Sequence, residues 1–181
     1  MNKTSVVLAT LCGVLCSQIN AQVLTVAGGK TTGAATKHDY ASLELNLPWR
    51  EQVWQGENWI LDLNHAFSAS GFWDENSVYL LSWSPNLVFS WRNHNSWYPY
   101  FQAGLGIALF SDDRFESKDD DPYDDGTTDM GSYAQFESSL TLGLVYGRFG
   151  MRARLYHYSN GELASPNQGI DVAEFGINYR F

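Results

Sequence analysis

Long stretches of this sequence alternate between large apolar residues and small or polar ones with a period of two. In residues 134–146, AQFESSLTLGLVY, the large apolar side chains of one parity are Phe136, Leu140, Leu142, Leu144 and Tyr146. The same alternation runs through residues 41–49, 59–67, 79–91 and 97–110. Successive side chains of a β-strand point to opposite faces, so this pattern predicts half-buried strands.

The polar faces of these strands separate a membrane barrel from a soluble β-sandwich. A sandwich exposes charged side chains such as Lys and Glu, whereas these faces carry few lysines and many Ser, Asn, Gln and Gly residues. Trp, Tyr and Phe gather near the ends of the apolar faces, as in the aromatic girdles of outer-membrane barrels. Backbone groups in lipid must pair within the protein, so the strands have to close. The sequence therefore predicts an all-β fold, an antiparallel transmembrane β-barrel of the bacterial outer membrane.

Eight strands are expected in this barrel. They lie near residues 22–31, 38–49, 58–70, 77–92, 97–111, 132–147, 149–160 and 169–181. Gly28 and Gly29 weaken the first of them. An even number of strands leaves both ends of the chain on the periplasmic side, where residues 92–96 and 146–150 form short turns. The interior of so small a barrel is filled by side chains.

Residues 1–21, MNKTSVVLATLCGVLCSQINA, have the anatomy of a secretory signal peptide. A membrane-spanning helix needs about 20 apolar residues, and this apolar run is shorter. Lipoprotein processing at Cys16 is disfavoured because the preceding Leu15 is too bulky. Cys12 and Cys16 both leave with this segment, so the predicted mature barrel, residues 22–181, has no disulfide, no thiolate metal site and no cysteine nucleophile.

Residues 111–131, SDDRFESKDDDPYDDGTTDMG, form the long loop between the fifth and sixth strands. A calcium loop is one interpretation, but DPYDDG puts Tyr123 where an EF-hand needs a ligand oxygen. We therefore expect a solvated extracellular loop and no metal site. The formal net charge of −9 argues against nucleic acid as a partner.

The strand at residues 149–159, FGMRARLYHYS, shows which parity faces lipid. Arg152 and Arg154 share one parity, and charged side chains at membrane depth belong inside a barrel, where Glu137 and Glu174 can pair with them. The other parity therefore faces lipid.

His157 and Ser159 continue this lipid face towards the outer end of the strand. By the same parity argument Asp171 starts the lipid face of the last strand, and a hairpin closed by residues 160–168 sets it across from His157. Three polar groups at the outer-leaflet interface are either a nucleophilic triad or polar residues that border the membrane. Their position alone leaves both interpretations open.

The other histidines offer no comparable arrangement. His65 is expected on the lipid face of the third strand as a lone surface histidine, His94 in a periplasmic turn and His38 near the start of the second strand. Neither His38 nor His94 has an evident serine and acid on one face. No HExxH, P-loop or GxSxG motif occurs.

The C-terminal motif resembles that of the outer-membrane lipid A 3-O-deacylases of the PagL type. The resemblance rests on HYSN at residues 157–160 and PNQGID at residues 166–171, close to the end of an eight-stranded barrel. FQAGLGIALFS at 101–111 and FES at 136–138 are similar to the family's fifth and sixth strands. The family has a glutamate where this chain has Asp171, and tends to have an acid at the position of Ser138.

The resemblance implies a serine esterase with Ser159 as nucleophile, His157 as its base and Asp171 as the group that orients the imidazole. The substrate it implies is the 3-hydroxyacyl ester at position 3 of lipid A in lipopolysaccharide. That ester would be reached sideways from outer-membrane lipid.

The loop between the last two strands would support the reaction. Backbone N–H groups of Asn160 and Gly161 are the expected oxyanion donors, and Asn167 is expected to order the loop. No metal or cofactor is implied. The alternatives are a non-enzymatic small barrel with a structural or adhesin role, a phospholipid or other lipid A acyl hydrolase, and a lipid A acyltransferase.

Overall fold

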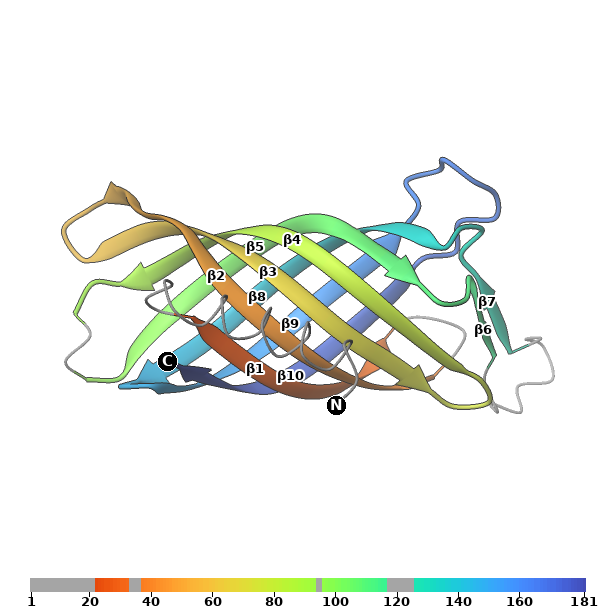
Figure 1. Cartoon of the computed structure of the whole chain (residues 1–181), viewed down its shortest axis with the longest axis horizontal. Helices are drawn as coiled ribbons and strands as arrows, with labels where there is room; N and C mark the ends of the chain where they lie inside the picture. Colours follow the sequence, from red (N-terminus) through yellow and green to blue (C-terminus); the bar gives the residue numbers. More distant parts are fainter. Residues whose placement is uncertain (1–21, 33–36, 94–95, 117–125) are drawn as a thin grey trace, which may run out of the picture.

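The computed structural model describes residues 22–32, 37–93, 96–116 and 126–181. Within them eight strands close into an antiparallel barrel in the order β1-β10-β9-β8-β5-β4-β3-β2 (Figure 1). The barrel strands are β1 (Val23–Thr32), β2 (Asp39–Gln55), β3 (Trp59–Trp73), β4 (Ser77–Trp91), β5 (Tyr98–Phe110), β8 (Ala134–Tyr146), β9 (Phe149–Ser159) and β10 (Ile170–Arg180). The predicted eight-stranded barrel is confirmed, while the predicted signal peptide lies outside the described residues.

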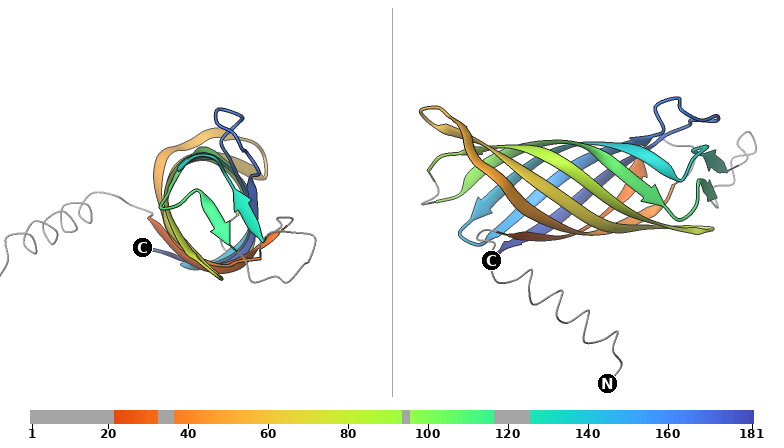
Figure 2. Two further views of the ribbon diagram at one scale, coloured as in Figure 1. Left: turned by 90° about the vertical axis from the view of Figure 1, so that its right-hand side faces the viewer. Right: turned by 45° about the horizontal axis from the view of Figure 1, so that its top comes forward.

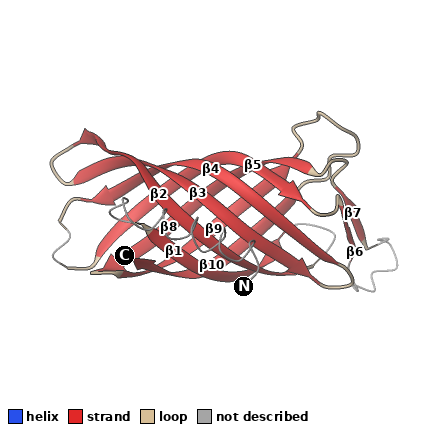
Figure 3. Cartoon of the chain, in the orientation of Figure 1, coloured by secondary structure: helices blue, strands red, loops and turns tan. Residues whose placement is uncertain are grey.

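Figure 3 shows the strands joined by loops at the two ends of the barrel. One end carries the C-terminus and the link from β8 to β9. The other end, called the outer end below, carries the loop between β9 and β10 (Figure 1). No helix in the described part of the chain has the length and apolarity of a membrane span.

The outer surface of the barrel is apolar. Along β9 exposed and buried residues alternate without interruption up to Tyr158. Outward-facing side chains such as Leu105 and Leu142 keep 72% and 66% of their surface exposed. Large apolar side chains exposed in this density fit a lipid environment and not water. The parity predicted for the lipid face is therefore confirmed on β9.

Ion pairs fill the middle of the barrel. Arg152 Nη2 lies 2.6 Å from Glu174 Oε1, and both Arg152 and Arg154 pair with Glu44 of β2. Arg154 also donates from Nε to Thr141 Oγ1 at 2.5 Å. These side chains are almost completely buried. Such a network fixes the interior, because removing one member leaves another charge buried without compensation.

Of the two acids that were expected to pair with the interior arginines, one does so. Glu174 pairs with Arg152 as predicted, but the second acid is Glu44 and not Glu137. The register explains the difference, because Arg154 lies across from Thr141 on β8, whereas Glu137 lies across from Tyr158, closer to the outer end.

Strand β2 continues to Gln55, beyond the predicted end at Trp49. Its pairing with β3 shifts register between Pro48 and Arg50 and again between Arg50 and Trp54. Proline cannot donate a ladder hydrogen bond and commonly sits at such irregularities. The strand therefore extends past the proline as a bulged, exposed ribbon.

A short hairpin of β6 (Arg114–Glu116) and β7 (Thr127–Asp129) crosses the outer mouth of the barrel (Figure 2, left). Phe115 and Met130 are completely buried there, and the Phe115 ring packs edge-on against Phe72 at 5.2 Å. The prediction of a solvated loop over 111–131 was therefore wrong at both ends of that stretch, because two isolated apolar side chains are buried in a hydrophobic core. Its acidic middle, residues 117–125, lies outside the described residues.

Candidate active site

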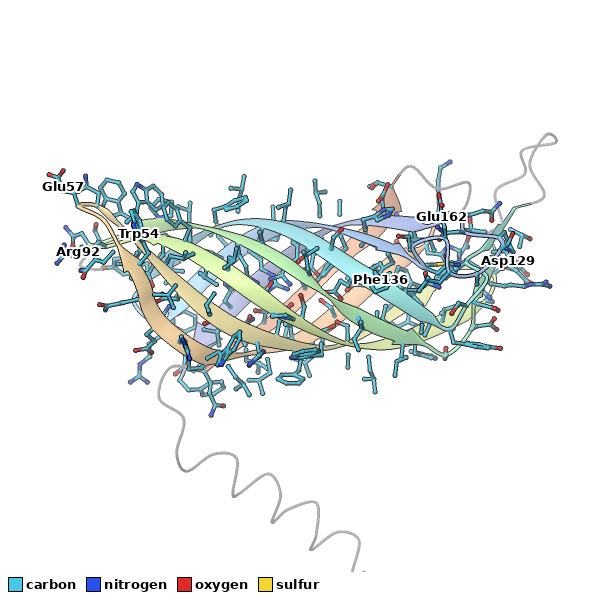
Figure 4. The ribbon with its side chains drawn as sticks, turned by 90° about the horizontal axis from the view of Figure 1, so that it is seen from above. Trp54, Glu57, Arg92, Asp129, Phe136 and Glu162 are labelled. Atoms are coloured by element: carbon cyan, nitrogen blue, oxygen red, sulfur yellow. The ribbon has the colours of Figure 1, made fainter. Side chains whose placement is uncertain are left out.

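The antiparallel pairing of β9 with β10 brings two of the predicted catalytic residues together, and Ser159 lies one residue beyond the last pair of this ladder. His157 is the direct ladder partner of Asp171, as the predicted hairpin required. On the other side of β9, Ser159 lies across from Phe136 and His157 across from Ser138 of β8. Figure 4 shows Phe136 near the outer end of the barrel, opposite the end that carries Trp54.

A hydrogen bond joins the histidine and the acid. The Nδ1 atom of His157 lies 2.7 Å from Oδ1 of Asp171, and each side chain is about half exposed, at 53% and 54%. An ionised carboxylate can only accept, so Nδ1 carries the proton in this contact. In a neutral imidazole the other nitrogen, Nε2, is then left as an acceptor and can serve as a base.

Gly169 packs against two of the predicted catalytic residues, His157 and Ser159. Its φ is +61°, and a Cβ placed there would lie 3.3 Å from Cε1 of His157 and 3.8 Å from Cβ of Ser159. The backbone at this position thus forms one wall beside the histidine and the serine. The sequence pattern gave Gly169 no role, although a glycine at the junction of a loop and a strand is a signal for a left-handed conformation.

The loop from residue 160 to residue 169 is anchored by two asparagines. The backbone N–H of Asn160 donates to Oδ1 of Asn167 at 3.0 Å, so Asn167 ties the two ends of the loop together. The buried side chain of Asn160 donates from Nδ2 to the carbonyls of Ala164 and Pro166, at 3.0 and 3.3 Å. The backbone N–H of Asn160, which was expected to be an oxyanion donor, is therefore already bonded to Asn167. Gly161 packs beside the ring of Phe136.

A shallow depression of about 760 Å³ begins at the His157–Asp171 pair and runs across the outer surface. Its outward-facing apolar lining is Pro85, Leu87, Ala103, Leu105, Leu140 and Leu155. A separate cavity of about 260 Å³ inside the barrel is lined by Tyr98, Tyr100 and Arg152 among others, and by none of the three predicted catalytic residues. The space beside His157 and Asp171 is therefore on the lipid side, and Ser159 is not among the residues that line it.

The other histidines lie elsewhere. His65 faces outward on β3, as expected, where it stacks on Trp49 at 4.8 Å and accepts a hydrogen bond from Nε1 of Trp83 at 3.3 Å. His38 is buried at the outer mouth against Phe115, with ring centroids 5.4 Å apart. His94 lies outside the described residues.

Comparisons with known proteins point to one family. The family model described as lipid A 3-O-deacylase (PagL) matches residues 39–180. The lipid A deacylase PagL of Pseudomonas aeruginosa is 28% identical over 179 residues, which cover 91% of this chain and 90% of that protein. The lipid A deacylase PagL of Bordetella bronchiseptica is 29% identical over 174 residues, which cover 89% and 88%.

Solved structures share the fold. The crystal structure of the outer membrane enzyme PagL superposes with a TM-score of 0.75 at 24% identity and covers 87% of this chain and 98% of that one. The N-terminal β-barrel domain of Pseudomonas aeruginosa OprF gives a TM-score of 0.53 at 15% identity, with coverage of 90% and 98%. The higher score for the first indicates a closer match of the backbone.

Proposed function

The chain belongs to the lipid A 3-O-deacylase (PagL) family, and we propose that in the outer membrane it hydrolyses the 3-hydroxyacyl ester at position 3 of lipid A, with Ser159 as the nucleophile. The observation that carries this proposal is the hydrogen bond from His157 to Asp171. His157 lies two residues before Ser159 and shares its lipid-facing parity. A histidine oriented by an acid beside a serine is the arrangement that activates a hydroxyl.

The reaction proceeds in two halves. Ser159 Oγ attacks the ester carbonyl carbon while its proton passes to Nε2 of His157, and the tetrahedral intermediate collapses when the imidazolium protonates the departing sugar oxygen. Water then attacks the acyl-serine with His157 again as base, which releases a 3-hydroxy fatty acid and restores the serine. Asp171 stabilises the imidazolium in both halves.

The loop supplies the groups around the developing oxyanion. The N–H of Gly161 is the donor that we assign to this role, because the N–H of Asn160 is held by Asn167. Asn160 and Asn167 keep the loop in place so that the donor is positioned before the substrate arrives. Preorganised donors of this kind contribute about 3–4 kcal/mol to the stabilisation of an oxyanion.

The substrate chain reaches Ser159 from the membrane. Lipid A lies in the outer leaflet, and the apolar depression beside His157 accommodates an acyl chain along Leu155 and Leu140. The middle of the barrel interior holds the buried ion pairs of Arg152, which are unfavourable surroundings for an acyl chain. A lipid-facing site needs no route through the interior.

The aspartate at position 171 is long enough for its role. The family glutamate is one methylene longer, but direct ladder partners have Cβ atoms only about 4.5–5.5 Å apart. The distance of 2.7 Å to His157 supports a working contact with the shorter side chain.

The proposal is tested with purified protein refolded in detergent and given lipopolysaccharide. We expect release of one 3-hydroxy fatty acid and a matching loss of mass from lipid A in the mass spectrum. Ser159→Ala should abolish the release, whereas Ser138→Ala, which removes a hydroxyl directly across from His157, should retain it. An unchanged lipid A mass with folded protein favours a non-enzymatic barrel, and acid released from phospholipid alone favours a phospholipase.

A further inference from the structure

The β6–β7 hairpin shares a core with the strands that carry the proposed site. Phe115 and Met130 are buried in one cluster with Tyr158 of β9 and Ile170 of β10. Tyr158 lies between His157 and Ser159 in the chain and points inward, where its ring packs edge-on against Phe110 at 5.4 Å. The hairpin is thus built onto the inner side of the same strand ends whose outer side bears the site.

Three hydrogen bonds and one close backbone approach join the end of β7, with the two residues after it, to the loop after Ser159. The carbonyl of Met130 accepts a hydrogen bond from Nδ2 of Asn160 at 2.8 Å. The N–H of Asp129 donates to Oε1 of Gln168 at 2.5 Å, and the N–H of Gln168 donates back to the carbonyl of Asp129 at 3.4 Å. Gly131, with φ +66°, lies so close to the carbonyl oxygen of Pro166 that a Cβ would be only 2.0 Å from it.

Asp129 is itself held firmly. Its Oδ1 accepts a hydrogen bond from the N–H of Gly131 at 2.8 Å, and its Oδ2 lies 3.3 Å from Nε of Arg114 on β6. Asp129 and Glu162 lie at the same end of the barrel in Figure 4, so the hairpin and the loop are neighbours there. These contacts hold the end of β7 in place, and the 160–169 loop is hydrogen-bonded to it.

Gln168 transmits this support to the site. It directly precedes Gly169, whose backbone packs against His157 and Ser159, and it directly follows Asn167, which holds the N–H of Asn160. The Gln168 side chain is exposed. Its hydrogen bond to Asp129 therefore fixes the position of the loop and does not belong to a buried core.

We propose that Gln168 is a positioning residue for the reaction, which acts by fixing the 160–169 loop to the β6–β7 hairpin. This inference rests on the proposed function and assigns to it the link between the loop and the end of β7. Loss of the Gln168–Asp129 hydrogen bond lets Gly169 shift relative to the imidazole of His157. A displacement of about 1 Å costs a reaction of this kind about a hundredfold in rate.

The test compares two variants of Gln168. Gln168→Met keeps the length of the side chain but carries a methyl group where Oε1 accepts from the Asp129 N–H. We expect kcat to fall about tenfold to a hundredfold with KM near the wild-type value. Gln168→Glu keeps an acceptor oxygen and should restore kcat. A residue that only stabilises the fold would not produce this rescue at an unchanged unfolding temperature.

Asn76 provides the matched control. Its Nδ2 donates to the carbonyl of Arg114 at 2.9 Å and its Oδ1 accepts from the N–H of Glu116 at 3.1 Å, so it ties the hairpin to the β3–β4 link and not to the 160–169 loop. Asn76→Ala should leave kcat close to wild type. An equal loss of kcat in Asn76→Ala and Gln168→Met would overturn the specific role of Gln168.

Amide hydrogen exchange over residues 158–169 gives a readout independent of turnover. We expect faster exchange in Gln168→Met, and wild-type exchange in Gln168→Glu and Asn76→Ala. Unchanged exchange in Gln168→Met, or wild-type kcat in that variant, would overturn the inference. A wild-type protein without activity on lipopolysaccharide that nonetheless shows the expected exchange would overturn the proposed function and leave the coupling of loop and hairpin standing.

Discussion

His157 Nδ1 lies 2.7 Å from Asp171 Oδ1, and the two residues are direct partners in the β9–β10 ladder. The contact is made on the lipid side, whereas Glu174, three residues along β10, pairs with Arg152 inside the barrel. Parity therefore places the two acids on opposite faces of β10, because a strand turns successive side chains to opposite faces.

Asp171→Asn should lower kcat by about two to four powers of ten without changing the unfolding temperature. An amide can hold the imidazole in place but cannot stabilise its charged form. Asp171→Glu should keep most of the turnover, because it restores the family's residue. Steady-state kinetics of both variants on lipopolysaccharide, with thermal unfolding, check this, and a fully active Asp171→Asn would remove the acid from the triad.

Glu174→Gln should destabilise the barrel by about 3–5 kcal/mol, because it leaves Arg152 to share Glu44 with Arg154 in a buried site. Turnover of the folded fraction should remain. Heat-induced unfolding, followed by the mobility shift of the barrel in gels, measures the loss. Wild-type stability in Glu174→Gln, together with lost turnover, would show that Glu174 and not Asp171 serves the site.

Gly169→Ala should reduce kcat at least tenfold, because the added methyl group meets His157 Cε1 at 3.3 Å and the carbonyl oxygen of Tyr158 at 3.2 Å. Gly147→Ala is the matched control. Gly147 has almost the same φ, +59°, with no atom within 4 Å of a Cβ. Both variants should lose about 1 kcal/mol of stability from the left-handed backbone, and equal turnover in the two would show that Gly169 does not shape the site.

Acidic pH should loosen the β6–β7 hairpin through His38. Burial lowers the pKa of the His38 imidazole, and the nearby Asn76 and Asp74 offset this only in part. A histidine whose folded pKa is depressed stabilises the fold above its ordinary value near 6.5, and the stabilisation is lost as the pH falls below that value. Hydrogen exchange of residues 126–131, divided by the intrinsic exchange rate of each amide at the same pH, should therefore rise between about pH 7 and about pH 5. His38→Gln should abolish this rise, and a loss of protection that persists in the variant would assign it to another group.

The sequence predicted the barrel and the β9–β10 register well because both depend on local information. The alternation of β9 is uninterrupted from Phe149 to Tyr158, and the loop from 160 to 169 leaves one register that keeps the apolar parity outward. The meeting of His157 with Asp171 follows from that register alone.

The parts that were missed depend on contacts between distant segments. Glu44 reaches Arg152 only because the closed barrel sets β2 three strands away from β9, with β1 and β10 between them. Phe115 and Met130 stand alone in an acidic stretch, so no periodicity marks them as buried. The hydrogen bond from the N–H of Asp129 to Oε1 of Gln168 joins β7 to the 160–169 loop, two segments whose separate sequences indicate only polarity and turns.

Trapping the acyl-enzyme tests the central claim most directly. The purified protein is mixed with lipopolysaccharide, quenched in acid during turnover and digested with trypsin, which separates Ser159 from Ser138 because Arg148, Arg152 and Arg154 lie between them. We expect a 3-hydroxyacyl group on the peptide that spans residues 155–180, assigned to Ser159 by fragmentation and absent from Ser159→Ala. Release of the fatty acid with no adduct on this peptide, or with the adduct on Ser138, would contradict Ser159 as the nucleophile.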